Sequence, residues 1–148
     1  MKMIEIKTLT KDLIERLLII WESSVRATHD FLSDEEINNI KKYVPDALKN
    51  IEHLIILEDT SKQPLGFMGI SNQTLEMLFI ADKNRGKGLG KQLLTYGIEH
   101  YAVQKLTVNE QNPLARGFYE HMGFQTYKRS EFDEQGNNYP ILYMRKID

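Results

Sequence analysis

The chain has 148 residues, of which 19 are lysine or arginine and 21 are aspartate or glutamate, so its formal net charge at pH 7 is -2. This length and an ordinary hydrophobic content of 41% predict one domain over residues 1–148, and the charge argues against nucleic acid as a main partner. The chain has no cysteine, which excludes disulfides, thiolate metal ligands and a cysteine nucleophile.

The N-terminal third is predicted to hold one strand and two or three helices. The start of the chain has no long apolar run, so we expect no signal peptide, and the alternation of Ile4, Ile6 and Thr8 with charged residues predicts a strand. Thr10 is a suitable N-cap for a helix over about 11–26. Its apolar run, residues 17–21, is too short to span a bilayer, so we expect no membrane partner and, without cysteine, a cytoplasmic protein.

A second helix and a short helical segment should follow. Ser33-Asp34-Glu35-Glu36 has the pattern of a capping box, which predicts a helix toward Tyr43. Pro45 breaks this helix, and a short helical segment to Ile51 is expected after it.

The rest of the chain alternates strands and helices. The predicted strands cover residues 54–57, 65–71, 75–80, 106–108, 124–132 and 139–147, and the predicted helices cover about 88–101 and 113–122. The last two strands are joined by a turn at 134–138. This order predicts an α/β (α+β) protein with a mixed sheet flanked by helices.

A glycine-rich loop lies between the strand at 75–80 and the helix that follows it. From residue 85 it reads Arg-Gly-Lys-Gly-Leu-Gly-Lys, and it opens directly into the helix. The unpaired N–H groups of a first helical turn bind anions such as a pyrophosphate, and glycine at 86, 88 and 90 keeps side chains away from them. A P-loop would need Gly-Lys-Ser/Thr, and a dinucleotide fingerprint would need a third glycine where Lys91 stands. A plain helix entry with glycines for tight packing remains an alternative.

Two spaced motifs carry a family resemblance. Arg85, Gly88 and Gly90 form Arg-x-x-Gly-x-Gly, and the stretch from Asn112 to Phe124 forms Asn-x-x-Ala-x-x-x-Tyr-x-x-x-Gly-Phe. Together they resemble the GNAT family of N-acetyltransferases, and the resemblance covers essentially the whole chain, with residues 75–124 diagnostic. Trp21, Ser24-Val25 and residues 27–32 and 108–112 are similar to a small bacterial subgroup of that family.

The resemblance implies the GNAT fold and acetyl-CoA as co-substrate. The fold would have a mostly antiparallel seven-stranded sheet, about four helices and a splay between strands four and five. The pantetheine arm of acetyl-CoA would lie along the fourth strand, where a backbone N–H near Leu78 would polarise the thioester carbonyl. The pyrophosphate of acetyl-CoA would lie on the glycine loop. The implied cofactor-binding residues are Leu78, Phe79, Ile80, Arg85, Gly86, Lys87, Gly88, Leu89, Gly90, Lys91, Asn112 and Tyr119. No metal is implied, and His53, His100 and His121 have no metal-ligand spacing.

Tyr119 is the predicted general acid. Tyr119 lies seven positions after Asn112, which is two helical turns, so both side chains lie on the same side of the helix. A phenol with a pKa of about 10 is protonated at neutral pH and can donate to the departing thiolate. The family implies this role for Tyr119 and a cofactor contact for Asn112. The alternative for Tyr119 is a core tyrosine packed beside Phe118.

The general base has several candidates. An alkylammonium acceptor, with a pKa of about 10, must lose a proton before it can attack. Glu76 would face the same side as Leu78 by strand alternation, and the segment around His29 commonly lines the acceptor pocket in this family. Glu110 is a further candidate, but Glu76 could equally be a solvated strand residue, and His29 could simply cap a helix.

The predicted function is therefore direct transfer of an acetyl group from acetyl-CoA to a primary amine, of a small molecule or of a protein lysine or N-terminus. The alternative is a non-catalytic acyl-CoA-binding sensor or adaptor, which would not need Tyr119. An acidic acceptor pocket could draw on five residues: Asp30, Glu76, Glu110, Glu131 and Asp133. GNAT proteins are often dimers, so the chain is expected to be a monomer or a homodimer.

Overall fold

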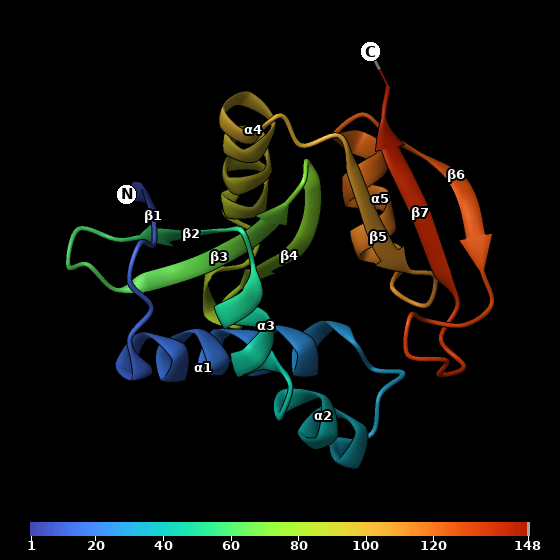
Figure 1. Cartoon of the computed structure of the whole chain (residues 1–148), viewed down its shortest axis with the longest axis horizontal. Helices are drawn as coiled ribbons and strands as arrows, with labels where there is room; N and C mark the ends of the chain where they lie inside the picture. The colour runs from blue at the N-terminus through green and yellow to red at the C-terminus, as the bar shows by residue number, and fades with distance from the viewer. Residues whose placement is uncertain (148) are drawn as a thin grey trace.

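The computed structural model describes residues 1–147, in which seven strands form one mixed sheet with helices on both faces (Figure 1). The strands are β1 (Lys2–Glu5), β2 (His53–Glu58), β3 (Pro64–Ser71), β4 (Thr74–Ile80), β5 (Lys105–Asn109), β6 (Phe124–Ser130) and β7 (Ile141–Lys146). The helices are α1 (Lys11–Thr28), α2 (Asp34–Lys41), α3 (Val44–Asn50), α4 (Leu89–Tyr101) and α5 (Pro113–His121), with a 3-10 turn η1 (Asp82–Asn84) before α4.

The sheet has the order β1-β2-β3-β4-β5-β7-β6, and of its six strand pairs β4–β5 is parallel. That pair is short, because it joins Thr74 to Lys105 and Leu75 to Leu106 and goes no further. Figure 1 shows β4 and β5 diverging beyond this contact. The predicted mixed, mostly antiparallel sheet and its splay are therefore confirmed.

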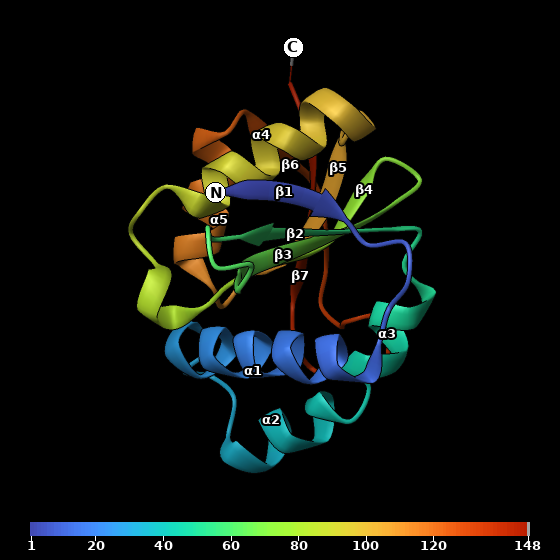
Figure 2. The same ribbon diagram turned by 90° about the vertical axis from the view of Figure 1, so that its left-hand side faces the viewer.

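Two cores lie on opposite faces of the sheet, and both follow from the sequence periodicity. On one face α4 and α5 pack over apolar residues such as Ile55, Met68 and Leu106. On the other face α1, α2 and α3 cover residues such as Leu54, Ile56 and Phe67. Figure 2 shows α1 and α2 below the sheet and α4 above it. No helix of residues 1–147 is long and apolar enough to cross a membrane.

Local capping explains where the N-terminal helices begin. Thr10 accepts a hydrogen bond from the Leu13 N–H at 3.1 Å, and Ser33 and Glu36 form the predicted capping box. Pro45 lies in the first turn of α3, where its missing N–H costs nothing, so α3 is the short helical segment expected before Ile51.

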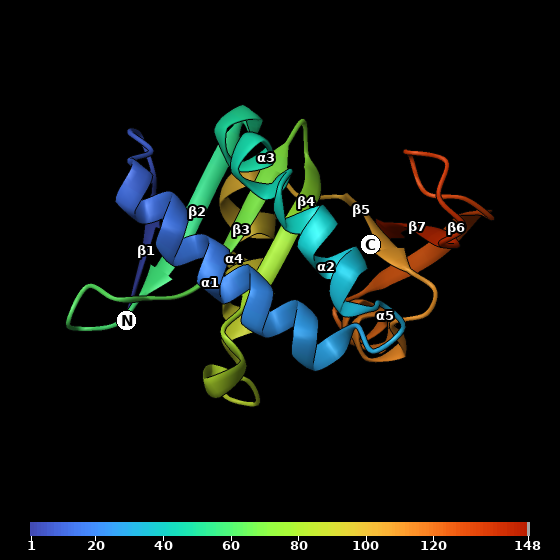
Figure 3. The ribbon, with the colours of Figure 1, turned by 90° about the horizontal axis from the view of Figure 1, so that it is seen from below.

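Helix α1 is longer than expected, because it continues to Thr28 rather than Arg26. Seen from below, α1 runs under β1–β4 with its C-terminal end toward α5 (Figure 3). The two extra residues bring Thr28 and the following His29 to the open end of the splay.

Three predicted strands are shorter in the structure. The first strand ends at Glu5 rather than Thr8. The loop between the last two strands is longer than predicted. Within it the Asp133 carboxylate accepts hydrogen bonds from the backbone N–H groups of Gln135 and Asn137, at 3.0 and 2.8 Å. As a result β6 ends at Ser130 and β7 begins at Ile141.

Candidate active site

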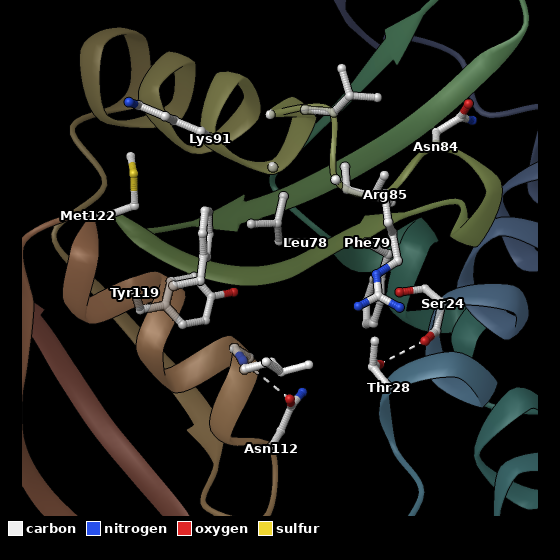
Figure 4. A pocket seen from close by; sticks show the side chains of 18 of the residues that line it. Ser24, Thr28, Leu78, Phe79, Asn84, Arg85, Lys91, Asn112, Tyr119 and Met122 are labelled. Atoms are coloured by element: carbon white, nitrogen blue, oxygen red, sulfur yellow. Dashed lines mark hydrogen bonds between the residues drawn. The ribbon is translucent and has the colours of Figure 1, made fainter.

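A cavity of about 460 Å³ occupies the splay between β4 and β5. Five parts of the chain line it: the C-terminal end of α1, the end of β4, the glycine loop, the first turn of α4, and α5 (Figure 4). Its walls are mostly apolar, with polar groups at the rim, as is usual for a small-molecule site. The lining residues that the sequence predicted are Leu78, Phe79, Ile80, Arg85, Gly86, Gly88, Leu89, Gly90, Lys91, Asn112, Tyr119 and His29.

The glycine loop forms one end of this cavity. Gly86 and Gly88 have φ values of 78° and 76°, and Gly88 is the N-cap of α4. No other atom lies within 4 Å of a Cβ built on either residue, so glycine is required here by backbone conformation rather than by crowding. Arg85 extends into the cavity in Figure 4, and its guanidinium pairs with Asp82 at 3.2 Å. Lys91 lines the cavity, whereas Lys87 lies outside its lining.

Helix α5 positions Asn112 and Tyr119, the two residues that the sequence predicted to lie on one side of this helix. Asn112 caps this helix, because its side-chain oxygen accepts a hydrogen bond from the Ala115 N–H at 3.3 Å. Tyr119 packs between Phe118 and Phe124, and Figure 4 shows its hydroxyl pointing into the cavity. Burial raises the pKa of the Tyr119 phenol above its ordinary value, which keeps the hydroxyl protonated at neutral pH.

Asn84 also lines the cavity and was not predicted as a site residue. It lies at the end of η1, its exposed fraction is 9%, and it lines the cavity next to Arg85. Within residues 1–147 its Nδ2 is buried without a hydrogen-bond partner. Buried amides are rarely unpaired in folded proteins, and Figure 4 shows this side chain pointing away from the cavity, so its amide is not placed to contact a molecule bound there. No spacing rule in the sequence identifies it.

Ser24 and Thr28 also line the cavity without having been predicted as site residues. They lie one helical turn apart on α1, and the Thr28 hydroxyl donates to the Ser24 carbonyl at 2.7 Å. The sequence offered one signal, since both belong to the stretch that resembles the bacterial subgroup.

A second cavity, of about 320 Å³, lies beside the first. It is bounded by the segment after α1, by α2, by the end of β5 and by the loop between β6 and β7. His29 lines both cavities and so stands at their junction. Of the five predicted acidic residues, Asp133 lines this second cavity, and Glu36 joins it there.

The three candidate bases differ in position. Glu110 lies outside both linings and pairs with Arg129 at 2.6 Å, which lowers the pKa of its carboxyl. Glu76 also lines neither cavity, and burial and the nearby Glu134 raise its pKa. Burial lowers the pKa of His29, against a smaller opposite effect of Asp30.

A strand irregularity explains where Glu76 lies. Gly69 pairs with Met77 and Ile70 with Leu75, so Glu76 has no partner on β3. Leu75 and Leu78 consequently belong to the same core, although simple alternation would place them on opposite faces. The irregularity lies between Leu75 and Met77, whereas Met77 and Leu78 pair in regular register with Gly69 and Met68, so the expectation that Glu76 faces the same side as Leu78 stays a prediction.

Within residues 1–147 no group of three histidine, aspartate or glutamate side chains lies close enough together to hold a metal ion. The chemistry that the described cavities offer comes from a helix N-terminus, an arginine, a buried amide, a phenol and an imidazole.

This splayed sheet and its glycine loop define a class of protein. Residues 26–146 match the family model described as "Acetyltransferase (GNAT) domain". The chain therefore belongs to the GNAT family, and it is an acetyltransferase.

Its relatives include the small bacterial subgroup expected from the sequence. The chain is 39% identical over 128 residues to the peptidyl-lysine N-acetyltransferase YjaB of Salmonella typhimurium, covering 86% of this chain and 88% of that protein. The solution structure of apo YjaB from Escherichia coli superposes with a TM-score of 0.87 at 36% identity and covers 99% of both chains. A Thermoplasma acidophilum PaiA N-acetyltransferase in complex with coenzyme A has a TM-score of 0.72 at 20% identity over both whole chains, which shows the shared fold.

Proposed function

We propose that this protein transfers the acetyl group of acetyl-CoA directly to the ε-amino group of a lysine in a protein or peptide. The observation that carries the proposal is the Tyr119 hydroxyl, which points into a cavity that the glycine loop lines. Two relatives named as peptidyl-lysine N-acetyltransferases support lysine as the acceptor. A small amine or a protein N-terminus would present the same nucleophile.

The lining fits acetyl-CoA residue by residue. The amides of Gly86 to Gly90 and the Arg85 guanidinium would hold the pyrophosphate, with Lys91 adding positive charge. The edge of β4 at Leu78–Ile80 has no β5 partner, so its backbone groups can pair with the pantetheine amides. Asn112 is a further polar contact.

The chain's own groups then account for the transfer. Backbone amides of β4 near Leu78 would stabilise the oxyanion that forms when the amine attacks the thioester carbonyl. The buried, protonated Tyr119 would give its proton to the CoA thiolate as the carbon–sulfur bond breaks. Attack by the amine is direct, so no covalent enzyme intermediate is needed.

The test compares Tyr119→Phe with the parent chain on a lysine peptide. Because general acid catalysis contributes about 10²-fold or more, we expect kcat to fall by that factor while the KM and the Kd for acetyl-CoA stay unchanged. Thiol release measures the rate, and isothermal titration measures the affinity. Tyr127→Phe, at an exposed position on β6, is the matched control and should behave as the parent.

Two outcomes would contradict the proposal. Equal turnover of Tyr119→Phe and the parent would remove Tyr119 as the acid. Tight binding of acetyl-CoA without thiol release for lysine peptides, polyamines or free amino acids would favour the alternative, a non-catalytic acyl-CoA sensor.

A further inference from the structure

His29 stands where the two cavities meet. It follows the last residue of α1, and its backbone N–H still donates to the Val25 carbonyl at 2.8 Å, so the helix fixes its position. Its ring lies 5.4 Å from the ring of Phe31, which in turn lies 6.1 Å from that of Tyr139. This row of rings joins the segment after α1 to the start of β7 across the second cavity. An acceptor side chain that entered through the second cavity would pass His29 before it reached the first cavity.

The hydrogen bonds of Thr28 determine which ring nitrogen of His29 carries a proton. The Thr28 Oγ1 lies 2.7 Å from the Ser24 carbonyl oxygen and 2.7 Å from the His29 Nδ1. A carbonyl oxygen can only accept, so the single hydroxyl proton of Thr28 must point to Ser24. The Thr28 oxygen can then only accept from the imidazole, which requires a proton on Nδ1. In a neutral ring this leaves Nε2 with a free lone pair.

We propose that His29 Nε2 is the proton acceptor for the incoming lysine ammonium, and that Thr28 is a positioning residue that holds His29 in the Nδ1–H tautomer. This inference rests on the proposed lysine acetylation and assigns the step that the other candidate bases leave open. Glu76 and Glu110 line neither cavity, whereas His29 lines both.

The surroundings of His29 favour a neutral ring. Burial lowers the pKa of His29, so the imidazole is unprotonated and able to accept a proton at neutral pH. The titratable and charged groups around it come from every wall of the two cavities: Asp30 on its own segment, Glu36 on α2, Asp133 on the β6–β7 loop, Arg85 and Lys91 at the glycine loop, and His121 on α5. The acidic pair Glu36 and Asp133 lies on the acceptor side, where a lysine ammonium would enter.

The proton transfers of the reaction balance, and they use only groups already named. The ammonium gives one proton to Nε2, and the free amine attacks the thioester carbonyl, so that a carbon–nitrogen bond forms and the carbon–sulfur bond breaks. The thiolate takes the Tyr119 proton, and the second proton lost by the amine nitrogen restores the phenol. The proton on Nε2 leaves to solvent, and the products are an amide, a free thiol and one released proton.

Kinetics over a range of pH test the role of His29. We expect His29→Gln to lower kcat at pH 7 by about 10²-fold, with unchanged affinity for acetyl-CoA. The deficit should shrink as the pH approaches the amine's own pKa of about 10, because free amine is then available without a base. His100→Gln, at an exposed site on α4 outside both cavities, is the matched control. A deficit that is the same at all pH values would overturn the assignment.

Two substitutions of Thr28 separate positioning from packing. Thr28→Val keeps the shape but removes the oxygen, so we expect a several-fold loss of kcat and a shifted pH profile. Thr28→Ser restores the oxygen, so its kcat should return to within about twofold of the parent. Parental activity in Thr28→Val would exclude the positioning role, as would a Thr28→Ser variant no better than Thr28→Val.

A readout independent of activity is the tautomer itself. In ¹⁵N-labelled protein, long-range ¹H–¹⁵N correlation spectra show which ring nitrogen is unprotonated, and His29→Gln identifies the His29 signals. We expect an unprotonated Nε2 in the parent. In Thr28→Val we expect His29 no longer to prefer the Nδ1–H tautomer. An Nε2–H tautomer in the parent would contradict the inference. If instead the parent fails to acetylate any amine, the proposed function fails while the tautomer result stands separately.

Discussion

At the scale of the residue, two buried asparagines that line the same cavity differ in how their side-chain amides are hydrogen-bonded. Asn112 has an exposed fraction of 7%, and its side-chain oxygen is engaged in capping α5. Asn84 is as deeply buried, yet its Nδ2 has no partner within residues 1–147. Burying a donor without a partner costs about 1–3 kcal/mol, so the Asn84 amide lowers the stability of the folded protein.

Replacing Asn84 by leucine, which has the same branching and the same number of side-chain heavy atoms, should therefore change stability without changing binding. We expect the free energy of unfolding of Asn84→Leu without ligand to be unchanged or higher by about 1 kcal/mol, because the unpaired donor is gone. Affinity for acetyl-CoA should stay within about twofold of the parent, because the amide does not face the cavity. Urea titration and isothermal titration check the two effects. A less stable variant would show that the Asn84 amide is not a net cost to folding, and a tenfold loss of affinity would show that it reaches the ligand.

At the scale of the element, the entry to α4 combines two glycines with different roles. Gly88 lies at the N-cap in the left-handed region, which disfavours any other residue. Gly90 lies inside the helix, and a Cβ there would meet the Phe118 ring at an ordinary contact distance of 3.6 Å. The motif therefore contains one glycine that the backbone requires and one that it does not.

Alanine substitutions at these two positions should have opposite effects. Gly88→Ala should lose about 1 kcal/mol of stability through its positive φ and bind acetyl-CoA more weakly, because the turn must relax. Gly90→Ala should gain roughly 0.5–1 kcal/mol from helix propensity and keep its affinity within about twofold. Thermal or urea unfolding with parallel titration measures both. Loss of affinity in Gly90→Ala, or none in Gly88→Ala, would contradict this division of roles.

At the scale of the whole molecule, a polar cluster joins the first strand to the far end of α4. The Tyr101 hydroxyl donates to the Glu5 carboxylate at 2.5 Å, and the ring of His53 packs 4.7 Å from that of Tyr101 and contacts Glu5 at 3.1 Å. The hydrogen bonds from Tyr101 and His53 lower the pKa of Glu5 from 4.5 to about 2. This cluster links residues 96 positions apart and fixes the β1 edge of the sheet.

Stability should depend on pH through this carboxylate. Because the folded pKa of Glu5 lies below its unfolded value, its contribution is complete above pH 4.5 and is lost as the pH falls toward 2. Tyr101→Phe should therefore cost on the order of 1–2 kcal/mol at pH 7 and distinctly less at pH 3. Urea unfolding followed by the fluorescence of buried Trp21 measures this difference. Tyr43→Phe, at an exposed position, should show no cost at either pH, and a pH-independent cost for Tyr101→Phe would exclude the carboxylate as its source.

The sequence predicted the parts of the site that depend on local spacing. The glycine loop and the pair Asn112 and Tyr119 lie within single turns or one helix, so their geometry follows from φ preferences and helical periodicity. The order of strands and helices along the chain followed similarly from the alternation of apolar runs with turn residues.

The parts that the sequence could not predict depend on contacts between distant segments. Asn84 became notable only when its burial without a partner was visible. The preference for His29 over Glu76 required the linings of the two cavities, which depend on the meeting of the α1 end with the β6–β7 loop. Alternation rules hold within a regular strand and give no warning of a bulge.

The short contact between β4 and β5 also has a consequence for how the chain is assembled. Apart from that contact, strands β1–β4 pair only with one another, and strands β5–β7 pair only with one another. Each half of the sheet is therefore formed by one contiguous stretch of sequence. During synthesis the first four strands and α4 can form before β5 emerges. The cavity does not exist at that stage, because Tyr119 and its helix are still missing. Competence to bind and react is therefore the last property that the growing chain acquires.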